Sequence, residues 1–98
     1  MLGLKVWKIQ GQSMAPTIPS GCYVLAVKWL ASFKIKVGHK LIIDHPKYGV
    51  IVKTVALIDK NGFIWSKGEN IQSVSVEELG PSSAEQILGR VIKIFKKT

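Results

Sequence analysis

The segment 50–58 restricts the possible folds of this chain more than any other. It reads Val-Ile-Val-Lys-Thr-Val-Ala-Leu-Ile, so that Lys53 is its only charged residue. A short apolar run rich in β-branched residues is typical of a buried strand. Because side chains alternate between the faces of a strand, Lys53 shares a face with Ile51, Val55 and Leu57. The sequence therefore predicts that the Lys53 amine points into apolar surroundings.

Further strand-like segments recur at short intervals, and residues typical of turns separate them. The Asn-Gly pair in Asp59–Gly62 favours a hairpin turn, and Ser82–Gln86 fits one helical turn with Ser82 or Ser83 as its cap. This pattern predicts a mainly β fold, a compact antiparallel coiled sheet or barrel with at most short helical turns. The predicted strands are Lys5–Gln10, Tyr23–Trp29, Lys40–Asp44, Val50–Ile58, Phe63–Lys67 and Leu88–Phe95.

Length and composition indicate one globular domain over residues 1–98, with 47% hydrophobic and 20% charged residues. No apolar stretch reaches the ~18–20 residues that a membrane helix needs. The segment 1–8 contains two lysines and lacks the long apolar core of a signal peptide. We therefore expect a cytoplasmic protein without a transmembrane segment. Cys22 is the only cysteine, which excludes an internal disulfide and a cysteine-based metal site.

The formal net charge of +8 raises the question of a nucleic-acid or anionic-membrane partner. All of the basic residues except Arg90 are lysines, and they are spread along the chain. Among these basic residues only Arg90 has the planar fork that suits bidentate contacts to bases or phosphates. We therefore interpret the lysines as a solvated surface and expect no nucleic-acid partner.

A lysine in apolar surroundings is a candidate general base, because burial disfavours its charged form and lowers its pKa. The segment 11–17, Gly-Gln-Ser-Met-Ala-Pro-Thr, offers Ser13 as a nucleophile between Gly11 and Pro16. A serine in an irregular loop can expose its hydroxyl and present neighbouring amides to an oxyanion. Each residue alone has a structural explanation. Ser13 is explained as part of a turn, and Lys53 as a residue that protects an edge strand against aggregation. Together they suggest a serine–lysine hydrolase.

Along nearly its whole length the chain resembles the signal peptidase I and LexA-like superfamily of serine–lysine proteases. Ser13–Thr17 resembles the nucleophile box Ser-Met-x-Pro-Thr, and Tyr48–Val55 resembles the box that carries the base. In form the chain most resembles the nickel-type superoxide dismutase maturation proteases, which trim a short N-terminal extension from a partner protein. Further matches are Val37–Ile43 with Pro46 (the strand before the lysine), Gly68–Asn70 (the Gly-Asp-Asn box), and 79–81 with 89–91 (the closing Gly-Pro and Gly-Arg-Val stretches).

The resemblance implies a LexA-like or signal peptidase fold and a protease that needs no metal or organic cofactor. Ser13 would be the nucleophile and Lys53 the base, and a protein or peptide precursor would be cleaved in trans. The Ser13 amide would contribute to the oxyanion hole, and Ser73 or Ser75 would orient the lysine amine. The residues implied to line the oxyanion and substrate site are Gly11, Gln12, Met14 and Pro16.

The chain departs from the family pattern at several positions, which bears on substrate and rate. Family members often have aspartate where this chain has Cys22 and His39. Arginine usually follows the lysine, where this chain has Thr54, and Glu69 replaces the aspartate of the Gly-Asp-Asn box. Residues 76–78, Val-Glu-Glu, stand in place of an Asp-Ser-Arg segment.

Other residues suggest alternative chemistry. A catalytic triad or a metal site is suggested by His39, His45 and Asp44. However, Asp44 and His45 would point to opposite sides of a strand. Cys22 with a histidine is an alternative nucleophile, although the apolar segment after it indicates a buried thiol. For the tryptophans we expect Trp7 and Trp65 in the core, whereas Trp29, Leu30 and Phe33 would form an exposed apolar tip that contacts substrate or membrane.

The alternative function is a catalytically silent β-barrel module that binds nucleic acid or anionic partners through its basic surface. The environment of Lys53 separates the two hypotheses. A buried amine near Ser13 favours the protease, and an amine in solvent on an edge strand favours the binding module.

Overall fold

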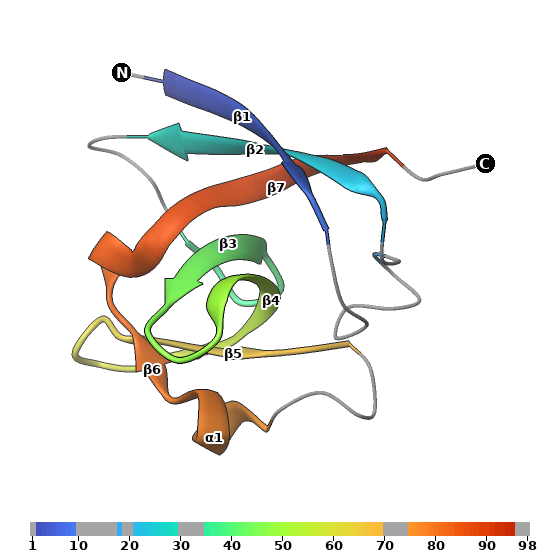
Figure 1. The fold of residues 1–98 in the computed structure, drawn as a ribbon. Helices are drawn as coiled ribbons and strands as arrows, with labels where there is room; N and C mark the ends of the chain where they lie inside the picture. The colour runs from blue at the N-terminus through green and yellow to red at the C-terminus, as the bar shows by residue number, and fades with distance from the viewer. Residues whose placement is uncertain (1, 10–17, 19–20, 30–34, 70–74, 96–98) are drawn as a thin grey trace.

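The computed structural model describes residues 2–9, 18, 21–29, 35–69 and 75–95, which form a mainly β fold (Figure 1). The prediction of a mainly β, antiparallel protein is therefore confirmed. Within these residues no helix is long and apolar enough to span a membrane. In chain order the elements are β1 (Leu2–Lys8), β2 (Tyr23–Trp29), β3 (Lys40–His45), β4 (Gly49–Ile58), β5 (Ile64–Lys67), α1 (Val76–Leu79), β6 (Pro81–Ser82), the 3₁₀ turn η1 (Ala84–Gln86) and β7 (Ile87–Phe95).

All six predicted strands are present, with differences at their ends. The largest is in β1, which begins at Leu2 rather than Lys5 and ends at Lys8 rather than Gln10. The expected helical turn near 82–86 is η1, whose N-cap is Ser83. The Ser83 N–H donates to Gln86 Oε1 at 2.9 Å. The sequence interpretation missed α1 and β6, which are only four and two residues long.

The seven strands form one sheet in the order β1-β2-β7-β3-β4-β5-β6, and every neighbouring pair is antiparallel. β7 therefore lies between β2 and β3, although both of these strands come much earlier in the sequence. Its first half pairs with β3, up to Arg90 opposite Leu41, and its second half pairs with β2, from Arg90 to Phe95. As Figure 1 shows, β7 crosses from the β3–β4–β5 part of the sheet to the β1–β2 part.

Two apolar clusters cover opposite faces of the sheet centre. Along β3, Leu41 and Ile43 belong to one cluster and Ile42 belongs to the other. A strand covered on both faces contains consecutive buried apolar residues instead of an alternation with polar ones. The coiling of the sheet thus encloses β3 and the middle of β4. The first cluster contains Ile9, Ile18, Cys22, Val24, Ala26, Ile42 and Val52, and the second contains Leu41, Ile43, Val55, Ile64 and Ile87.

A β-bulge at Ala56 interrupts the alternation of faces that the sequence predicts along β4. Val55 lies opposite Ser66 and Leu57 lies opposite Trp65, so that Ala56 is the extra residue between two paired positions. An extra residue reverses the faces of the side chains that follow. The prediction that Leu57 shares the buried face of Lys53 is therefore wrong. Leu57 is 54% exposed, and Ile58 packs against the core instead.

The hairpin turn predicted at Asp59–Gly62 is present, with Gly62 at a φ of 85°. The Asp59 carboxylate accepts hydrogen bonds from the N–H groups of Asn61 and Phe63 at 2.9 and 3.0 Å. The indole of Trp65 donates to the same carboxylate at 3.1 Å. These three donors, led by the indole, hold the pKa of Asp59 below its usual value. The turn is thus fixed by one ionised side chain.

Candidate active site

Lys53 lies in the middle of β4 and is only 3% exposed. Leu41 lies directly opposite it on β3. Side chains at opposite positions of an antiparallel pair share a face. The Lys53 stem therefore lies on the face of the second apolar cluster, to which Leu41 and Val55 belong. The predicted burial of Lys53 is confirmed, although Leu57 takes no part in it.

Burial lowers the pKa of the Lys53 ammonium below its ordinary value of 10.5, because a low-dielectric environment disfavours the charged form. No carboxylate offsets this effect. Every aspartate and glutamate of the chain belongs to the described residues, and among those residues the one ion pair joins Lys40 to Glu69. An amine in such surroundings can accept a proton at lower pH than an exposed lysine. The position is therefore chemically suited to a general base.

Ser13 and the implied oxyanion and substrate residues Gly11, Gln12, Met14 and Pro16 lie outside the described residues. The residues that flank this segment are described. The Ile9 N–H donates to the Cys22 carbonyl at 2.8 Å, and the Gly21 N–H donates to the Ile9 carbonyl at 2.8 Å. These two bonds bring the two sides of the segment together at the end of the β1–β2 pair.

The residues beside that segment also join the core. Ile9 and Ile18 are 6% and 0% exposed and belong to the same apolar cluster as Val52. Val52 immediately precedes Lys53 on β4. Ile9 and Ile18 therefore share the apolar cluster on the face of β4 opposite to the Lys53 side chain.

Of the two hydroxyls proposed to orient the lysine amine, Ser73 lies outside the described residues. Ser75 is described and exposed, and it forms the N-cap of α1, where its Oγ accepts from the Glu78 N–H at 3.1 Å. This cap explains Ser75 without reference to Lys53.

A buried hydroxyl that the sequence interpretation missed lies on the Lys53 face. Ser66 is 2% exposed and sits on β5 opposite Val55, two residues from Lys53 along β4. Positions diagonal to one another across a strand pair lie within reach of long side chains. Alternation in β5, with Ile64 and Ser66 buried and Lys67 exposed, is the signal that would have found it.

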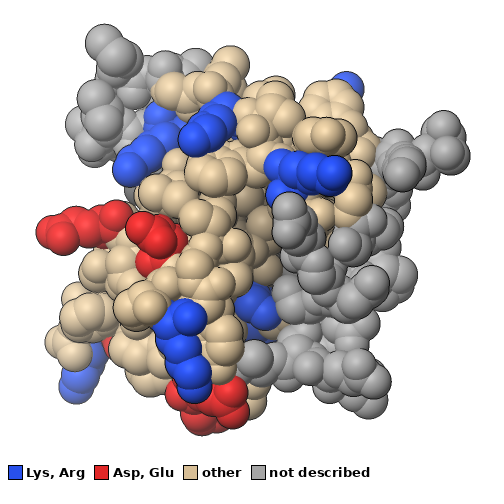
Figure 2. Space-filling model, in the orientation of Figure 1, with Lys and Arg blue, Asp and Glu red and all other residues tan. Residues whose placement is uncertain are grey.

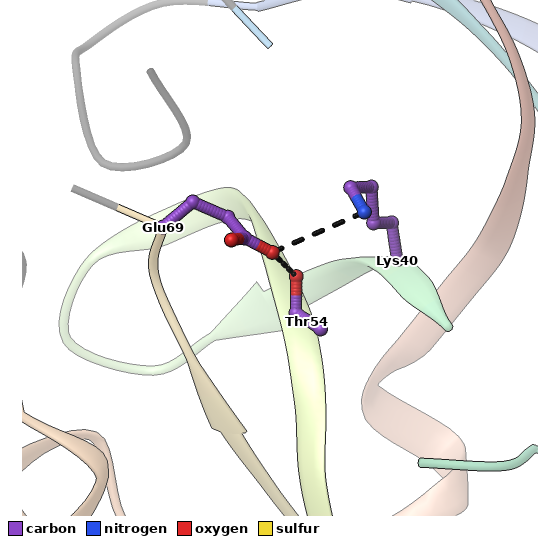
Figure 3. Close-up of polar contacts among 3 residues, drawn as sticks. All are labelled: Lys40, Thr54 and Glu69. Carbon is purple, nitrogen blue, oxygen red and sulfur yellow. Dashed lines mark hydrogen bonds and ion pairs between the residues drawn. The ribbon is translucent and has the colours of Figure 1, made fainter. Parts of the chain in front are cut away.

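Thr54 and Glu69, two positions that differ from the motifs which the sequence resembles, contact one another (Figure 3). The Thr54 hydroxyl donates to Glu69 Oε1 at 2.7 Å, and Lys40 Nζ lies 3.9 Å from the same oxygen. Thr54 is 5% exposed and points away from the Lys53 face, because it is the next residue on the strand. The bond ties the residue that follows Lys53 to the segment after β5. Glu69 is thus accounted for as a partner of Thr54.

His45 has a structural role that uses both ring nitrogens. Its Nδ1 accepts from the N–H groups of Lys47 and Tyr48 at 3.0 and 3.2 Å, so the ring proton is on Nε2, which donates to the Leu79 carbonyl at 2.8 Å. No lone pair is left for a metal or a serine. Within the part of the chain that the structure describes, no three His, Cys, Asp or Glu residues are grouped to hold a metal ion. The triad and metal alternatives are therefore not supported at His45 and Asp44.

Cys22 and Trp7 behave as expected, whereas Trp65, which was expected in the core, is half-buried and belongs to neither apolar cluster. Cys22 is 1% exposed in the first apolar cluster, in agreement with a structural thiol. Trp7 packs against that cluster with Lys5 Nζ 4.1 Å from its ring centroid, and Trp65 bonds to Asp59 as described above. Trp29 ends β2, whereas Leu30 and Phe33 of the predicted apolar tip lie outside the described residues.

No protein-family model matches this chain, and a search of curated proteins finds no matching sequence.

Proposed function

We propose that this protein is a serine endopeptidase with a Ser13–Lys53 dyad, and that its sheet is of the LexA-like or signal peptidase type. One observation carries the proposal. Lys53, which follows the pattern of the family's base, is buried on an apolar face and its pKa is lowered by that burial. A lysine placed on an edge strand to prevent aggregation would keep its amine in water.

In the proposed mechanism the neutral amine of Lys53 accepts the proton of the Ser13 hydroxyl as its oxygen attacks the peptide carbonyl carbon. The tetrahedral intermediate then collapses, and the Lys53 ammonium gives its proton to the leaving amine. Lys53 next accepts a proton from water, whose oxygen attacks the ester carbonyl. Release of the acid product returns the proton to Ser13. The reaction uses no cofactor.

The substrate we propose is a protein precursor that is cleaved in trans, with removal of a leader or propeptide. The resemblance to superoxide dismutase maturation proteases makes a superoxide dismutase precursor the first candidate. Because the cleavage site is not fixed by the described residues, the assay should begin with a mixture of peptides rather than one sequence.

The test is cleavage of a peptide library, with products identified by mass spectrometry. Wild type should cleave, and both Ser13→Ala and Lys53→Met should lose activity to a similar degree, because the two residues act as one unit. Lys60→Met is the matched control, since Lys60 is an exposed lysine in the Asp59 hairpin turn. Undiminished cleavage by Lys53→Met would remove Lys53 from the mechanism.

A second measurement does not depend on the substrate. NMR titration of the Lys53 side-chain nitrogen should give a pKa below the ordinary value of lysine. An unshifted titration would contradict the proposed role of Lys53 even if no substrate had been found.

The alternative function, a silent module for anionic partners, has one observation in its favour. On the face drawn in Figure 2, the upper part, where Figure 1 places β1, β2 and β7, carries basic side chains, whereas the middle and lower parts carry both acidic and basic ones. Binding to random duplex DNA, followed by fluorescence anisotropy, should be weak and disappear at modest salt if this charge only solubilises the protein. Tight binding well above physiological salt, together with no cleavage of the library, would favour the module.

A further inference from the structure

A cavity of about 310 Å³ lies between the start of β3 and the second half of β7. It exists because the two strands stop pairing at Leu41 and Arg90. Beyond that point β7 continues with β2 on its other side. The edge of β7 that faces β3 is therefore left open next to the turn before β3. The cavity is lined by Gly38, His39, Lys40, Val91, Ile92, Lys93 and Ile94.

Two hydrogen-bond donors face one another beside this cavity, His39 from its lining and Arg90 from the residue next to Val91, which also lines it. The Lys36 N–H donates to His39 Nδ1 at 3.1 Å, so the proton of the neutral ring is on Nε2. Nε2 lies 3.5 Å from Arg90 Nη1. A guanidinium only donates, and neither group can therefore satisfy the other. An oxygen acceptor beside them would accept hydrogen bonds from both.

The charge around this pair is positive, and of the lining lysines only Lys40 is paired with a carboxylate, that of Glu69. Arg90 is the only arginine, and among the described residues, which include every Asp and Glu, it has no carboxylate within ion-pair distance. Lys93 also lines the cavity. Burial, then Arg90, then Lys36 lower the pKa of His39. An anion in the cavity would oppose the effect of the two cations.

We propose that this cavity is a binding site for an oxyanion, a phosphate or carboxylate group, which accepts from Arg90 and from His39 Nε2–H. Arginine suits this ligand because its planar fork matches two oxygens at once. The cavity holds several times the ~30 Å³ that one water occupies, so the anion can belong to a larger molecule. The apolar part of that molecule would lie against Val91 and Ile94. His39 lies two residues before Leu41, which is opposite Lys53, so the site adjoins the Lys53 face of β4. Binding of the anion does not require the proposed dyad.

The experiment is an NMR titration of the full chain with inorganic phosphate and with acetate, each against sodium chloride at matched ionic strength. We expect saturable shifts of the His39 ring and Arg90 side-chain signals and a rise in the pKa of His39. Saturation by either anion supports the site, and the tighter one gives the ligand class. Shifts that do not saturate, or that chloride reproduces, would overturn the proposal.

Variants separate a built site from general charge attraction. Arg90→Gln should weaken binding about 10-fold or more, as expected for loss of a charge-assisted bond. Lys60→Gln removes one positive charge from the Asp59 hairpin turn, which does not line the cavity, and should bind as wild type does. If Arg90→Gln does not fold, His39→Phe keeps a ring of similar shape, removes the Nε2 donor and should also weaken binding. Equal weakening in Lys60→Gln, or full binding by the variants of Arg90 and His39, would refute the site.

Discussion

Replacement of Lys53 by methionine should change how stability depends on pH. The pKa of Lys53 is lowered in the folded protein, whereas in the unfolded chain it returns to ~10.4. Between these two pKa values the unfolded chain binds more protons than the folded one. Stability therefore rises with pH across this window, and below the folded pKa the protein carries the full cost of the buried ammonium. Methionine fills a similar volume and has no proton to lose.

The magnitude follows from linkage. One proton bound by the unfolded state and not by the folded state gives a slope of ~1.4 kcal/mol per pH unit in the free energy of unfolding. Wild type should approach this slope relative to Lys53→Met within the window. At neutral pH the variant should be at least as stable as wild type, because removal of a buried amine removes a desolvation cost and keeps the apolar contacts with Leu41 and Val55.

The assay is urea unfolding from about pH 6 to about pH 10, the range that leads up to the ordinary pKa of lysine. The quantity of interest is the difference in free energy between wild type and Lys53→Met at each pH. Lys60→Met serves as the control for the loss of one exposed lysine and should track wild type. A difference between wild type and Lys53→Met that stays constant with pH would show an ordinary amine and refute both the burial argument and the proposed base.

Three further predictions concern the framework of the site. Thr54→Val should cost about 1 kcal/mol in urea unfolding, because Glu69 loses its 2.7 Å donor while remaining partly solvated; unchanged stability would show that the bond contributes nothing. Gly89→Ala should cost about 1–3 kcal/mol, since the added Cβ would lie 3.1 Å from Ala26 Cβ and 3.3 Å from the Val27 carbonyl oxygen; equal stability would mean that the two strands can move apart. The lowered pKa of Asp59 stabilises the fold above its unfolded value of ~3.9, and this contribution is lost as pH falls through the folded pKa. Asp59→Asn should accordingly lose part of the acid dependence of the melting temperature, and an unchanged acid profile would contradict the role of the turn.

Strands and turns were predictable because local residue types determine them. An apolar run rich in β-branched residues located β4, and the Asn-Gly pair located the hairpin after it. The bulge at Ala56 was not predictable, because the residue that often marks a bulge is glycine and this position is an alanine. The helical turn α1 does carry a signal, the Ser-x-x-Glu pattern from Ser75 to Glu78, which is typical of a helix N-terminus.

The candidate site was predictable only where it depends on a single strand. Burial of Lys53 followed from the apolar run around it. The contact between Thr54 and Glu69 joins residues on separate segments, and nothing local to either one indicates the other. The same holds for His39 and Arg90, which meet only because β7 pairs with β3. Which residues meet across such sequence separations is determined by the order of the strands in the whole sheet.

The position of β7 has a consequence for how the chain reaches this fold. β7 follows every other described strand in the sequence, but it lies between β2 and β3. During synthesis the β1–β2 pair and the β3–β4–β5 meander can form early, and among the described strands only β7 pairs with both units. Until residues 87–95 emerge, each unit exposes a free strand edge to other nascent chains, and such edges are sites of aggregation. We therefore expect the nascent chain to be most prone to aggregation in the interval before β7 is synthesised, when β7 does not yet join the two units.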